Sequence, residues 1–330
     1  MPKDILDVLE KKIQKDYGEN IVIQGNHLKS GKLIRTGSIG LDLIIGGGVM
    51  EGTTLTLAGP YGVGKSSLAL YMATEAQKMS RKVIYFDSEF ALKPALLKTI
   101  PGLNLKELSV IRSSYAEETL DIMENYVKSG EKLFIILDSV ASLLMKKESE
   151  SEHEQETMMG VAKLMSKALR KMTGPCAKTC SNILFLNQYR TKPTLYGNPI
   201  VKPGGNALPY FATYEMEMKT GGKQDQILDK EGNIIGHNIN IKITKNKLYT
   251  PFKTTTVPLL YGKGFDSISE LINIGREVAL IIQKGPYFYL YEKTYQGKLQ
   301  LYDELTNKAD IVNKLRGDIY KMFNFEETNE

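Results

Sequence analysis

Cysteine is scarce in this sequence, and a long apolar segment is missing. The two cysteines, Cys176 and Cys180, lie in Pro-Cys-Ala-Lys-Thr-Cys, and no second Cys/His pair lies nearby to complete a zinc site. We therefore interpret them as free thiols of a reducing compartment, with a local disulfide or a metal site as the alternative. The N-terminus has no apolar signal core, and no apolar run reaches the roughly 18 residues that a membrane helix needs. We therefore expect a cytoplasmic protein without a membrane partner.

The bulk composition is that of a globular protein. The chain has 330 residues, which fits about two domains. Hydrophobic residues make up 42% and charged residues 25%, so disordered, collagenous and disulfide-built classes are excluded. The formal net charge of +5 is mildly basic. It permits a polyanionic partner such as nucleic acid without requiring one.

An amphipathic helix is predicted at the N-terminus. Over residues 4–17, Ile5, Leu9 and Ile13 recur at helical spacing with charged residues between them. Gly18 and a polar stretch separate this helix from the rest of the chain. A detached helix has nothing local to bury against, so it packs either on its own domain or on a neighbouring subunit. The pattern alone leaves both possibilities open.

Strand and helix patterns alternate from about residue 36. Short, fully apolar runs predict strands, and apolar residues three and four apart predict helices. Their alternation indicates a parallel sheet covered on both faces. The predicted strands are residues 53–58, 83–86, 133–137 and 183–186, and the predicted helices are residues 66–78, 117–129 and 161–172.

After about residue 205 the pattern changes. Strand-like segments joined by turns predict antiparallel strands that extend the parallel sheet. From about residue 267 onward a smaller unit is expected, with a helix, a Tyr-rich hairpin and a terminal helix. The antiparallel strands are predicted at 214–218, 239–243 and 254–260, and the elements of the smaller unit at 268–278, 285–295 and 311–323.

The strongest chemical signal is a Gly-rich loop with one Gly, four further residues and then Gly-Lys-Ser. It follows a predicted strand and opens a predicted helix, which is the context that a phosphate loop requires. Inward-pointing N–H groups and the helix N-terminus favour phosphate, although a Gly-rich turn without a ligand is the alternative. Lys65 is expected to reach the β- and γ-phosphates, and Ser66 to ligate Mg²⁺ through its hydroxyl. The expected nucleotide-binding residues here are Gly59, Pro60, Tyr61, Gly62, Val63, Gly64, Lys65, Ser66 and Ser67.

Polar side chains follow three predicted strands of the same sheet. Asp138 ends the apolar run 133–137, a position that favours a magnesium ligand over a helix N-cap. Glu89 follows the strand 83–86 and is the candidate base that activates water. Gln188 follows the strand 183–186 and is a candidate sensor of the γ-phosphate. From the residues alone, a surface acid at Glu89 and a loop-capping amide at Gln188 are equally open.

Several motifs in order resemble the bacterial RecA recombinase family. Beyond the phosphate loop, the resemblance rests on Arg35-Thr36-Gly37-Ser38, Asp87-Ser88-Glu89-Phe90-Ala91-Leu92, Asp138-Ser139-Val140-Ala141-Ser142-Leu143, Met165-Ser166-Lys167-Ala168-Leu169-Arg170-Lys171, Gly204-Gly205-Asn206-Ala207-Leu208, Lys245-Asn246-Lys247 and Leu260-Tyr261-Gly262-Lys263-Gly264. It runs from about residue 35 to 325. It implies an α/β fold: a RecA-like P-loop NTPase core with a mostly parallel twisted sheet and added antiparallel strands. It also implies a subunit-contacting N-terminal helix and linker at 1–34, the core at 35–266 and a small α+β C-terminal domain at 267–330.

The resemblance also implies an activity. The chain would be a DNA-dependent ATPase and homologous recombinase, using ATP and Mg²⁺. It would form a helical homopolymer on single-stranded DNA and exchange strands with duplex DNA, with single-strand-binding and mediator proteins as possible further partners. Glu89 would activate water, and Gln188 would report the γ-phosphate to a DNA loop. Lys245 and Lys247 would reach a neighbour's phosphates, Tyr261 would lie against adenine, and the N-terminal helix would dock on the adjacent protomer.

Two loops are implied for DNA, at about residues 146–159 and 189–203. The first loop is acidic in this chain, which is unusual beside phosphates. Contacts to backbone and phosphate give little base specificity, which suits a protein whose sequence reading is done by base pairing. The residues implied for DNA are Met158 or Met159, Lys163, Arg170, Arg190, Lys192, Gly204, Gly205 and Asn206.

The sequence departs from the family pattern at three places. Lys93, Pro94 and Leu96 occupy the region where the family has an aromatic residue and an acid near adenine, which puts adenine selectivity in doubt. The second loop is about one residue shorter, and the acidic tail is reduced to residues 326–330. Such divergence is typical of a phage or mobile copy, for which the location would be the host cytoplasm.

Two other functions share the same ATPase core. A hexameric helicase-type motor predicts a ring and a large N-terminal domain, but only about 50 residues precede the phosphate loop. A nucleotide-switched assembly module without strand exchange is motivated by the acidic first loop. Stimulation of ATP hydrolysis by single-stranded DNA separates the module from the recombinase.

Overall fold

The computed structural model describes residues 5–18, 21–27, 31–146, 154–191, 200–201, 205 and 207–325, with the backbone alone at 154–158, 190–191 and 200–201. Contacts divide the chain into two compact units, Met1–Lys32 and Leu33–Glu330. Within the described ranges, no helix is long and apolar enough to cross a membrane.

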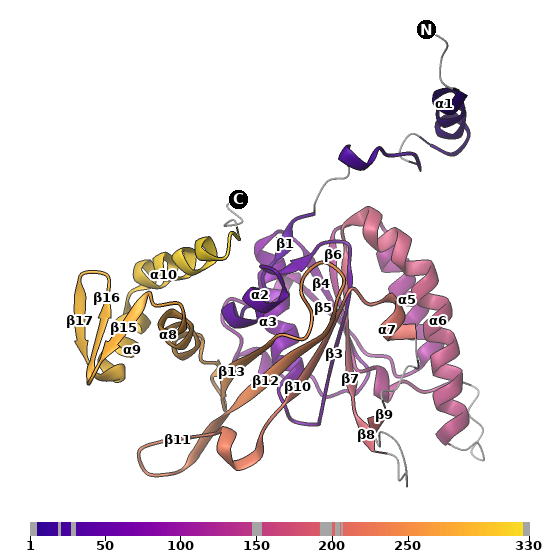
Figure 1. Ribbon diagram of the computed structural model, residues 1–330. Helices are drawn as coiled ribbons and strands as arrows, with labels where there is room; N and C mark the ends of the chain where they lie inside the picture. The colour runs from indigo at the N-terminus through magenta and orange to yellow at the C-terminus, as the bar shows by residue number, and fades with distance from the viewer. Residues whose placement is uncertain are drawn as a thin grey trace. The chain divides into compact units, whose positions relative to one another are not determined.

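The first unit contains the predicted N-terminal helix. Helix α1 spans Ile5–Tyr17, and a short 3-10 helix, η2, follows at Gly25–His27 (Figure 1). No residue of α1 is buried. Ile5 is 83% exposed and Leu9 49% exposed, so the apolar side chains of this amphipathic helix are open to solvent.

The second unit is built on a ten-stranded sheet with strand order β14-β13-β12-β10-β3-β7-β6-β4-β5, and β11 pairs with β12. From β10 to β5 all neighbours run parallel. The four predicted parallel strands are confirmed, β5 was not predicted, and the segment 214–218, predicted as antiparallel, is wrong in part because it pairs parallel with β3 and antiparallel only with β12. Every residue of β3 is buried, because helices cover both faces of this half. The parallel strands are β3 (Thr54–Gly59), β4 (Lys82–Asp87), β5 (Leu108–Ile111), β6 (Leu133–Asp138), β7 (Asn182–Gln188) and β10 (Tyr214–Lys219).

Antiparallel strands extend the sheet beyond β10. They are β11 (Gln226–Leu228), β12 (Ile234–Asn246), β13 (Thr254–Leu260) and β14 (Gly264–Phe265). Ile239, Ile241 and Ile243 of β12 are buried, with less buried residues between them. This alternation is typical of strands with one covered face. The small strands β1 (Leu33–Ile34) and β2 (Val49–Met50) form a separate pair.

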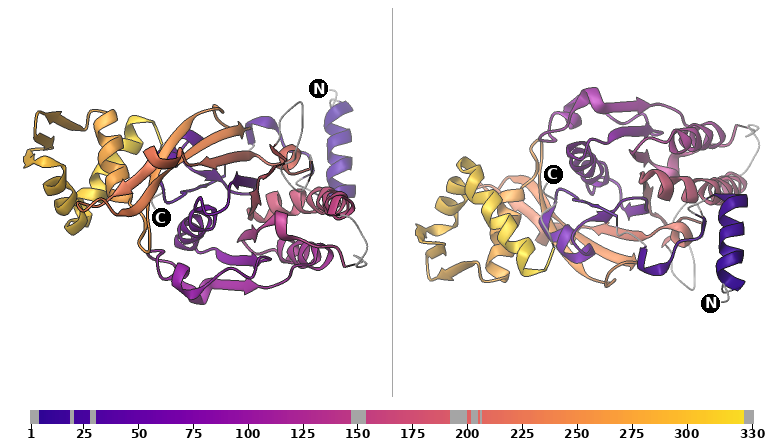
Figure 2. Two further views of the ribbon diagram at one scale, coloured as in Figure 1. Left: turned by 90° about the horizontal axis from the view of Figure 1, so that it is seen from below. Right: turned by 90° about the horizontal axis from the view of Figure 1, so that it is seen from above.

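Helices cover the two faces of the parallel strands. One face packs against α3 (Lys65–Lys78), with α2 (Ile39–Ile45) and α4 (Pro94–Leu97) beside it. The other face packs against α5 (Ala116–Lys128), α6 (Glu154–Thr179) and α7 (Ala207–Phe211). Figure 2 shows α5 and α6 lying together. Successive residues of one strand point to opposite faces of the sheet, so Leu184 of β7 enters the core on the α3 side and Phe185 the core on the α6 side.

Helix α6 is longer than the sequence predicted. It has 26 residues and begins at Glu154, inside the loop that was predicted at about 146–159. It continues through Pro175 and ends at Thr179. The prediction ended at Met172, yet Cys176 continues the same stripe four residues later and is only 1% exposed. The early turns carry few apolar residues, so helical periodicity could not detect them.

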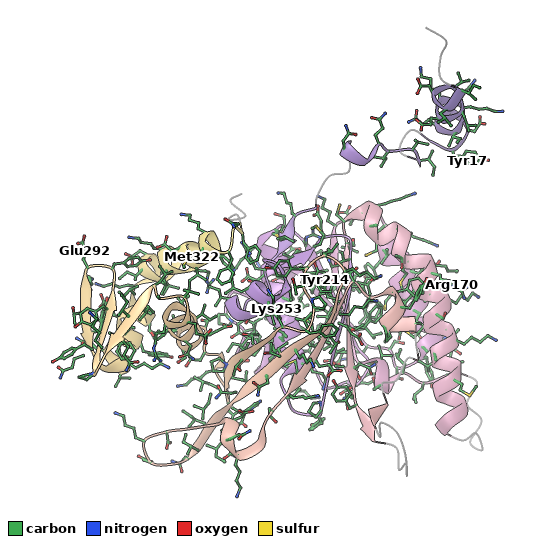
Figure 3. All side chains as sticks on the ribbon, viewed as in Figure 1. Tyr17, Arg170, Tyr214, Lys253, Glu292 and Met322 are labelled. Carbon is green, nitrogen blue, oxygen red and sulfur yellow. The ribbon has the colours of Figure 1, made fainter. Side chains whose placement is uncertain are left out.

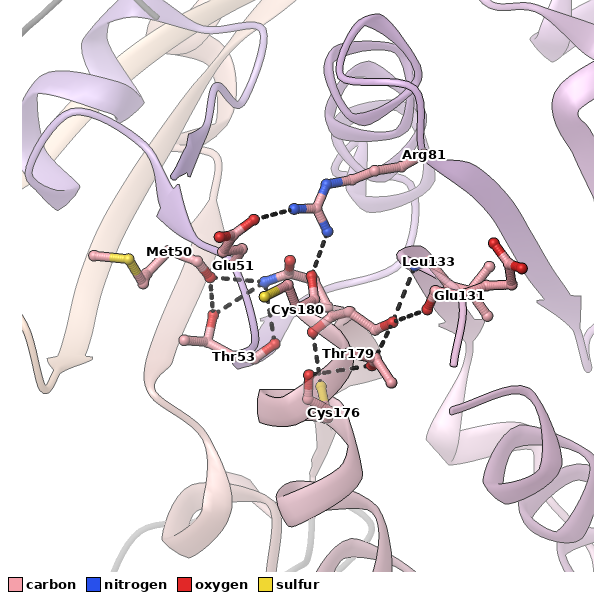
Figure 4. A network of polar contacts seen from close by, with 11 residues as sticks. Met50, Glu51, Thr53, Arg81, Glu131, Leu133, Cys176, Thr179 and Cys180 are labelled. Carbon is pink, nitrogen blue, oxygen red and sulfur yellow. Dashed lines mark hydrogen bonds and ion pairs between the residues drawn. The ribbon is translucent and has the colours of Figure 1, made fainter. Parts of the chain in front are cut away.

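A buried polar network fixes the end of α6 (Figure 4). The guanidinium of Arg81, 2% exposed, lies 2.7 Å from the carboxylate of Glu51 and donates to the carbonyl of Cys180. The thiol of Cys176 donates to the carbonyl of Ser181 at 2.8 Å, and burial raises its pKa to about 12. Both cysteines are free thiols, as predicted, and they serve packing at this helix end.

The C-terminal segment forms its own hydrophobic cluster. Its elements are α8 (Ser267–Glu277), β15 (Ile281–Lys284), β16 (Tyr287–Leu290), β17 (Lys293–Gln296), α9 (Gly297–Asn307) and α10 (Ala309–Met322). The predicted hairpin is a three-stranded antiparallel sheet, and α9 was not predicted. Leu301 and Leu305, four residues apart, provide the buried face of α9. Ile39 and Leu43 of α2 belong to the same cluster, so α2 connects this segment to the sheet.

Two fully buried carboxylates lie where α2 meets α8 and α10. Asp42 accepts hydrogen bonds from the hydroxyl of Tyr320 at 2.7 Å and from the backbone N–H of Thr36 at 2.8 Å. Glu270 accepts from the hydroxyl of Ser38 at 2.5 Å and from the N–H of Gly40 at 2.9 Å. Burial raises the pKa of Asp42 to about 6 and that of Glu270 to about 7, although these hydrogen bonds oppose the shift.

The raised pKa values predict a pH-dependent stability. Because the folded state holds these protons more tightly than the unfolded state, their contribution is greatest at acidic pH. It is lost as pH rises through about 6 and 7. Replacing Glu270→Gln keeps an oxygen acceptor and removes the titration. We expect the loss of unfolding free energy between pH 5 and pH 8 to shrink by about 2 kcal/mol in urea titrations. The exposed Glu277→Gln on the same helix is the control, and equal pH profiles for the two variants would contradict the assignment.

Candidate nucleotide and DNA sites

The predicted phosphate loop connects β3 to α3. Gly62 and Gly64 have positive φ angles of 71° and 99°, a backbone conformation that glycine adopts without strain. Gly64 is the N-cap of α3 and no side chain caps the helix, so its first N–H groups face the loop. Nothing lies within 4 Å of a Cβ placed on Gly62, and Tyr61 is 88% exposed. The local geometry therefore suits an anion above the helix N-terminus.

Lys65 is buried beneath the loop. Its ammonium donates to the carbonyls of Gly59 at 3.1 Å and Pro60 at 2.8 Å. Burial lowers the pKa of Lys65, and the nearby charges of Asp138 and Glu89 oppose that shift. The lysine is thus held at the loop by backbone acceptors that a phosphate group can replace.

Ser66 and Asp138 meet as the sequence predicted. The hydroxyl of Ser66 donates to Oδ2 of Asp138 at 2.6 Å, and the hydroxyl of Tyr85 donates to the same oxygen at 2.5 Å. Burial raises the pKa of Asp138, while the two hydroxyl donors lower it. The donor set consists of hard oxygen atoms, which are the ligands that Mg²⁺ prefers. In the part of the chain that the structure describes, no group of three or more His, Cys, Asp or Glu could hold a metal ion by itself. Oxygen atoms of the phosphates and of water would therefore complete the coordination shell of Mg²⁺.

Glu89 and Gln188 are in direct contact. The amide Nε2 of Gln188 donates to Oε1 of Glu89 at 2.6 Å. The hydroxyl of Ser139, the residue after Asp138, donates to the same oxygen. The three strand ends that carry Glu89, Asp138 and Gln188 therefore converge, because β4, β6 and β7 are neighbours in the sheet.

The segment that carries Glu89 is rigidly held. Asp87, 2% exposed, accepts hydrogen bonds from the N–H groups of Ala91 at 2.9 Å and Leu92 at 3.2 Å. The hydroxyl of Ser88 lies 2.8 Å from that of Ser142 in the 3-10 helix η4 (Val140–Ser142). These bonds close a turn around Glu89, so its carboxylate projects from a fixed backbone.

Tyr261 lies near the phosphate loop, at the end of β13. Leu259 stands two residues before Tyr261, and a methyl carbon of its side chain lies 3.3 Å from a Cβ placed on Gly64 of the phosphate loop. The ring of Tyr261 is 56% exposed, and its hydroxyl lies 3.1 Å from Nδ1 of the buried His237. Nε2 of His237 has no hydrogen-bond partner among the described residues. An exposed aromatic face beside a polar imidazole suits a nucleotide base.

Lys245 and Lys247 lie away from the phosphate loop of their own chain. In the sheet register, Lys245 pairs with Glu215, which pairs with Thr56 of β3. Thr56 is three residues before Gly59, a separation of about 10 Å at the usual strand rise. The ammonium of Lys247 donates to the carbonyl of Tyr210 at 3.4 Å, and that of Lys245 to the same carbonyl at 3.3 Å. Neither lysine is brought to the nucleotide site within one chain.

The residues implied for DNA lie on α6 and around the segment after β7. Lys163 and Arg170 are exposed on α6, and Figure 3 shows Arg170 on the outer side of this helix. Met159 is 74% exposed on the same helix rather than in a loop. Lys192, Gly204 and Asn206 lie outside the described residues, as do the side chains of Met158 and Arg190.

After β7 the chain forms a short antiparallel pair, β8 (Arg190–Thr191) with β9 (Ile200–Val201). Gly205 has a φ angle of 63°, and a Cβ placed on it would lie 3.0 Å from the Cβ of Ala162. Close packing against α6 therefore requires a small residue at Gly205.

Comparison with known proteins agrees with this geometry. A family model described as the RecA N-terminal domain matches residues 4–266. The chain is 35% identical to Protein RecA of Phytoplasma mali over 97% of this chain and 95% of that protein. It is 34% identical to Protein RecA of Mesoplasma florum, covering 94% and 93% of the two chains, and 36% identical to Protein RecA of Thermotoga neapolitana, covering 87% and 82%. The chain belongs to the RecA family.

The sequence did not identify every polar residue of the RecA-family site. Tyr85 and His237 were assigned no role, and Asp87 was named only as part of the motif that contains Glu89. A tyrosine within a fully buried strand was the available signal, because a buried hydroxyl needs a hydrogen-bond partner. His237 offered no pattern in the sequence, since its contact with Tyr261 depends on the register between β12 and β13.

Glu89→Gln tests the candidate base. We expect nucleotide binding to be retained while the turnover of ATP falls by more than about 10²-fold, the scale of general-base catalysis. Gln is nearly isosteric and can still accept from Gln188, so positioning is preserved and proton acceptance is lost. Single-turnover hydrolysis and nucleotide titration measure the two properties separately. The exposed Glu107→Gln serves as control, and near-normal turnover in Glu89→Gln would reject this role.

Proposed function

We propose that this chain is an ATP-dependent homologous recombinase. It forms helical filaments on single-stranded DNA, hydrolyses ATP with Mg²⁺ when DNA is bound, and pairs the strand with homologous duplex DNA. The chain then has three regions: the N-terminal helix and linker (1–34), the ATPase core (35–266) and a small C-terminal domain (267–330). Similarity to proteins named Protein RecA along nearly the full chain supports it.

One observation carries the proposed coupling between nucleotide and DNA: the hydrogen bond from Gln188 to Glu89, 2.6 Å long. Gln188 ends β7, and the chain enters β8 two residues later. A γ-phosphate that draws Gln188 away from Glu89 would pull on the segment proposed to bind DNA. DNA bound to that segment would, in turn, change how Glu89 is held. Nucleotide and DNA would then each raise the affinity for the other. Hydrolysis would depend on DNA because DNA changes the position of Glu89, the candidate base.

Assembly would add further cations to the nucleotide site, beside the Lys65 that each chain provides itself. The ammonium groups of Lys245 and Lys247 donate to a backbone carbonyl of α7, that of Tyr210, away from the phosphate loop of the same chain. In a head-to-tail polymer one protomer's lysines can face the next protomer's phosphates, where positive charge stabilises the transition state of phosphoryl transfer. The exposed apolar side chains of α1 provide a second contact with the adjacent protomer.

Electron microscopy tests the proposed function. The protein is imaged with single-stranded DNA and a slowly hydrolysed ATP analogue, and strand exchange is measured with ATP. Helical filaments with strand exchange are expected. Closed rings with unwinding would favour a helicase-type motor. Filaments without strand exchange or DNA-stimulated hydrolysis would favour an assembly module.

Lys247→Ala tests the contribution from the neighbouring protomer. The variant is expected to lower ATP hydrolysis mainly in the presence of single-stranded DNA, because only assembly brings this lysine to a nucleotide. Lys242→Ala changes an exposed lysine of β12, the strand that ends one residue before Lys247, and should leave hydrolysis unchanged. An equal loss with and without DNA would exclude a role that depends on assembly.

A further inference from the structure

We propose that Tyr85 is a positioning residue of the magnesium site: its buried hydroxyl holds the carboxylate of Asp138 in the orientation that the metal requires. This inference rests on the proposed nucleotide-dependent function. It adds a residue that acts through Asp138 and touches neither metal nor nucleotide itself.

The two side chains meet from adjacent parallel strands. Tyr85 of β4 pairs with Ile136 of β6, and Asp138 lies two residues further along β6. Tyr85 is 0% exposed, and its ring packs in the core on the α3 side of the sheet. Its hydroxyl donates to Oδ2 of Asp138 at 2.5 Å. The strand register and the packed ring together fix where this donor points.

Asp138 benefits from such a donor because its side chain is partly buried at the end of β6. Burial raises its pKa, while the hydroxyl donors Ser66 and Tyr85, and to a smaller extent the charge of Lys65, stabilise the charged form. Ser66 supplies one of these bonds, at 2.6 Å, but Ser66 is also the expected metal ligand. When its oxygen turns toward Mg²⁺, the geometry of that bond must change. Tyr85 is not a ligand, so its bond can persist in both states.

Among the other buried tyrosines, Tyr320 donates to the carboxylate of Asp42, whereas Tyr214 and Tyr71 contact backbone groups. The hydroxyl of Tyr214 accepts from the backbone N–H of Met50 at 3.1 Å, and that of Tyr71 accepts from Phe265 at 2.9 Å. Both serve backbone groups away from Asp138, whereas Tyr85 directs its hydroxyl to the acid. Partners in the outer shell that orient a metal ligand typically change metal affinity by about 10–100-fold when removed.

Tyr85→Phe removes the hydroxyl and keeps the ring that fills the core. The full-length variant is titrated with Mn²⁺, a paramagnetic substitute for Mg²⁺, in the presence of a slowly hydrolysed ATP analogue. Electron paramagnetic resonance reports the free metal. We expect the dissociation constant for Mn²⁺ to rise by about 10-fold. Binding of the analogue in EDTA should stay within about twofold of wild type. Tyr214→Phe, which removes a hydroxyl from an equally buried tyrosine, should match wild type in both measurements.

A double-mutant cycle separates positioning from general packing. In an Asp138→Asn background, Tyr85→Phe should change Mn²⁺ affinity by less than about twofold, because the group it orients is no longer an acid. Wild-type Mn²⁺ affinity in Tyr85→Phe overturns the inference, as does an undiminished effect in the Asp138→Asn background. Either result leaves the proposed function intact if the wild-type protein binds the analogue in a metal-dependent way. Absence of metal-dependent binding in wild type would overturn both.

Discussion

The hydrogen bonds to one partly buried carboxylate, that of Asp138, organise the candidate nucleotide site. A partly buried acid is stabilised by donors, and the donors come from two different elements: Ser66 from α3 and Tyr85 from β4. The next residue, Ser139, continues the network to Glu89, which in turn accepts from Gln188. The phosphate-loop helix, the candidate base and the segment after β7 are thus joined by hydrogen bonds around the ends of three neighbouring strands.

A parallel sheet makes this convergence possible. All carboxyl ends of β3, β4, β6 and β7 meet at one edge, so residues separated by more than 120 positions, such as Ser66 and Gln188, approach one another. The antiparallel strands carry Lys245 toward the opposite edge instead. One chain therefore carries the candidate phosphate-binding and metal-binding groups at one place and the cations Lys245 and Lys247 at another. This separation is the physical basis for proposing that the site is completed by a second protomer.

Helix α2 connects the C-terminal segment to the rest of the fold. Its apolar residues Ile39 and Leu43 enter the C-terminal hydrophobic cluster, and Asp42 accepts a hydrogen bond from Tyr320. Polar groups that are buried and fully paired define a unique packing arrangement better than apolar contact alone. The two carboxylates at this boundary, Asp42 and Glu270, make that arrangement sensitive to proton concentration.

Local patterns in the sequence predicted four parallel strands of the core, the helices between them, the phosphate loop and the strand-end positions of Glu89, Asp138 and Gln188. They did not predict α2, α4 or β5. The predicted features depend on residue spacing and on glycine, which act within a few positions of the chain. Helix α9, the full length of α6 and the three-stranded C-terminal sheet were not predicted, because their apolar stripes are short or include a cysteine. Only the tertiary structure decided that Tyr85 reaches Asp138, that His237 reaches Tyr261, and that Lys245 lies away from its own phosphate loop. Each of these depends on strand register, which brings together residues distant in sequence and which no local spacing specifies.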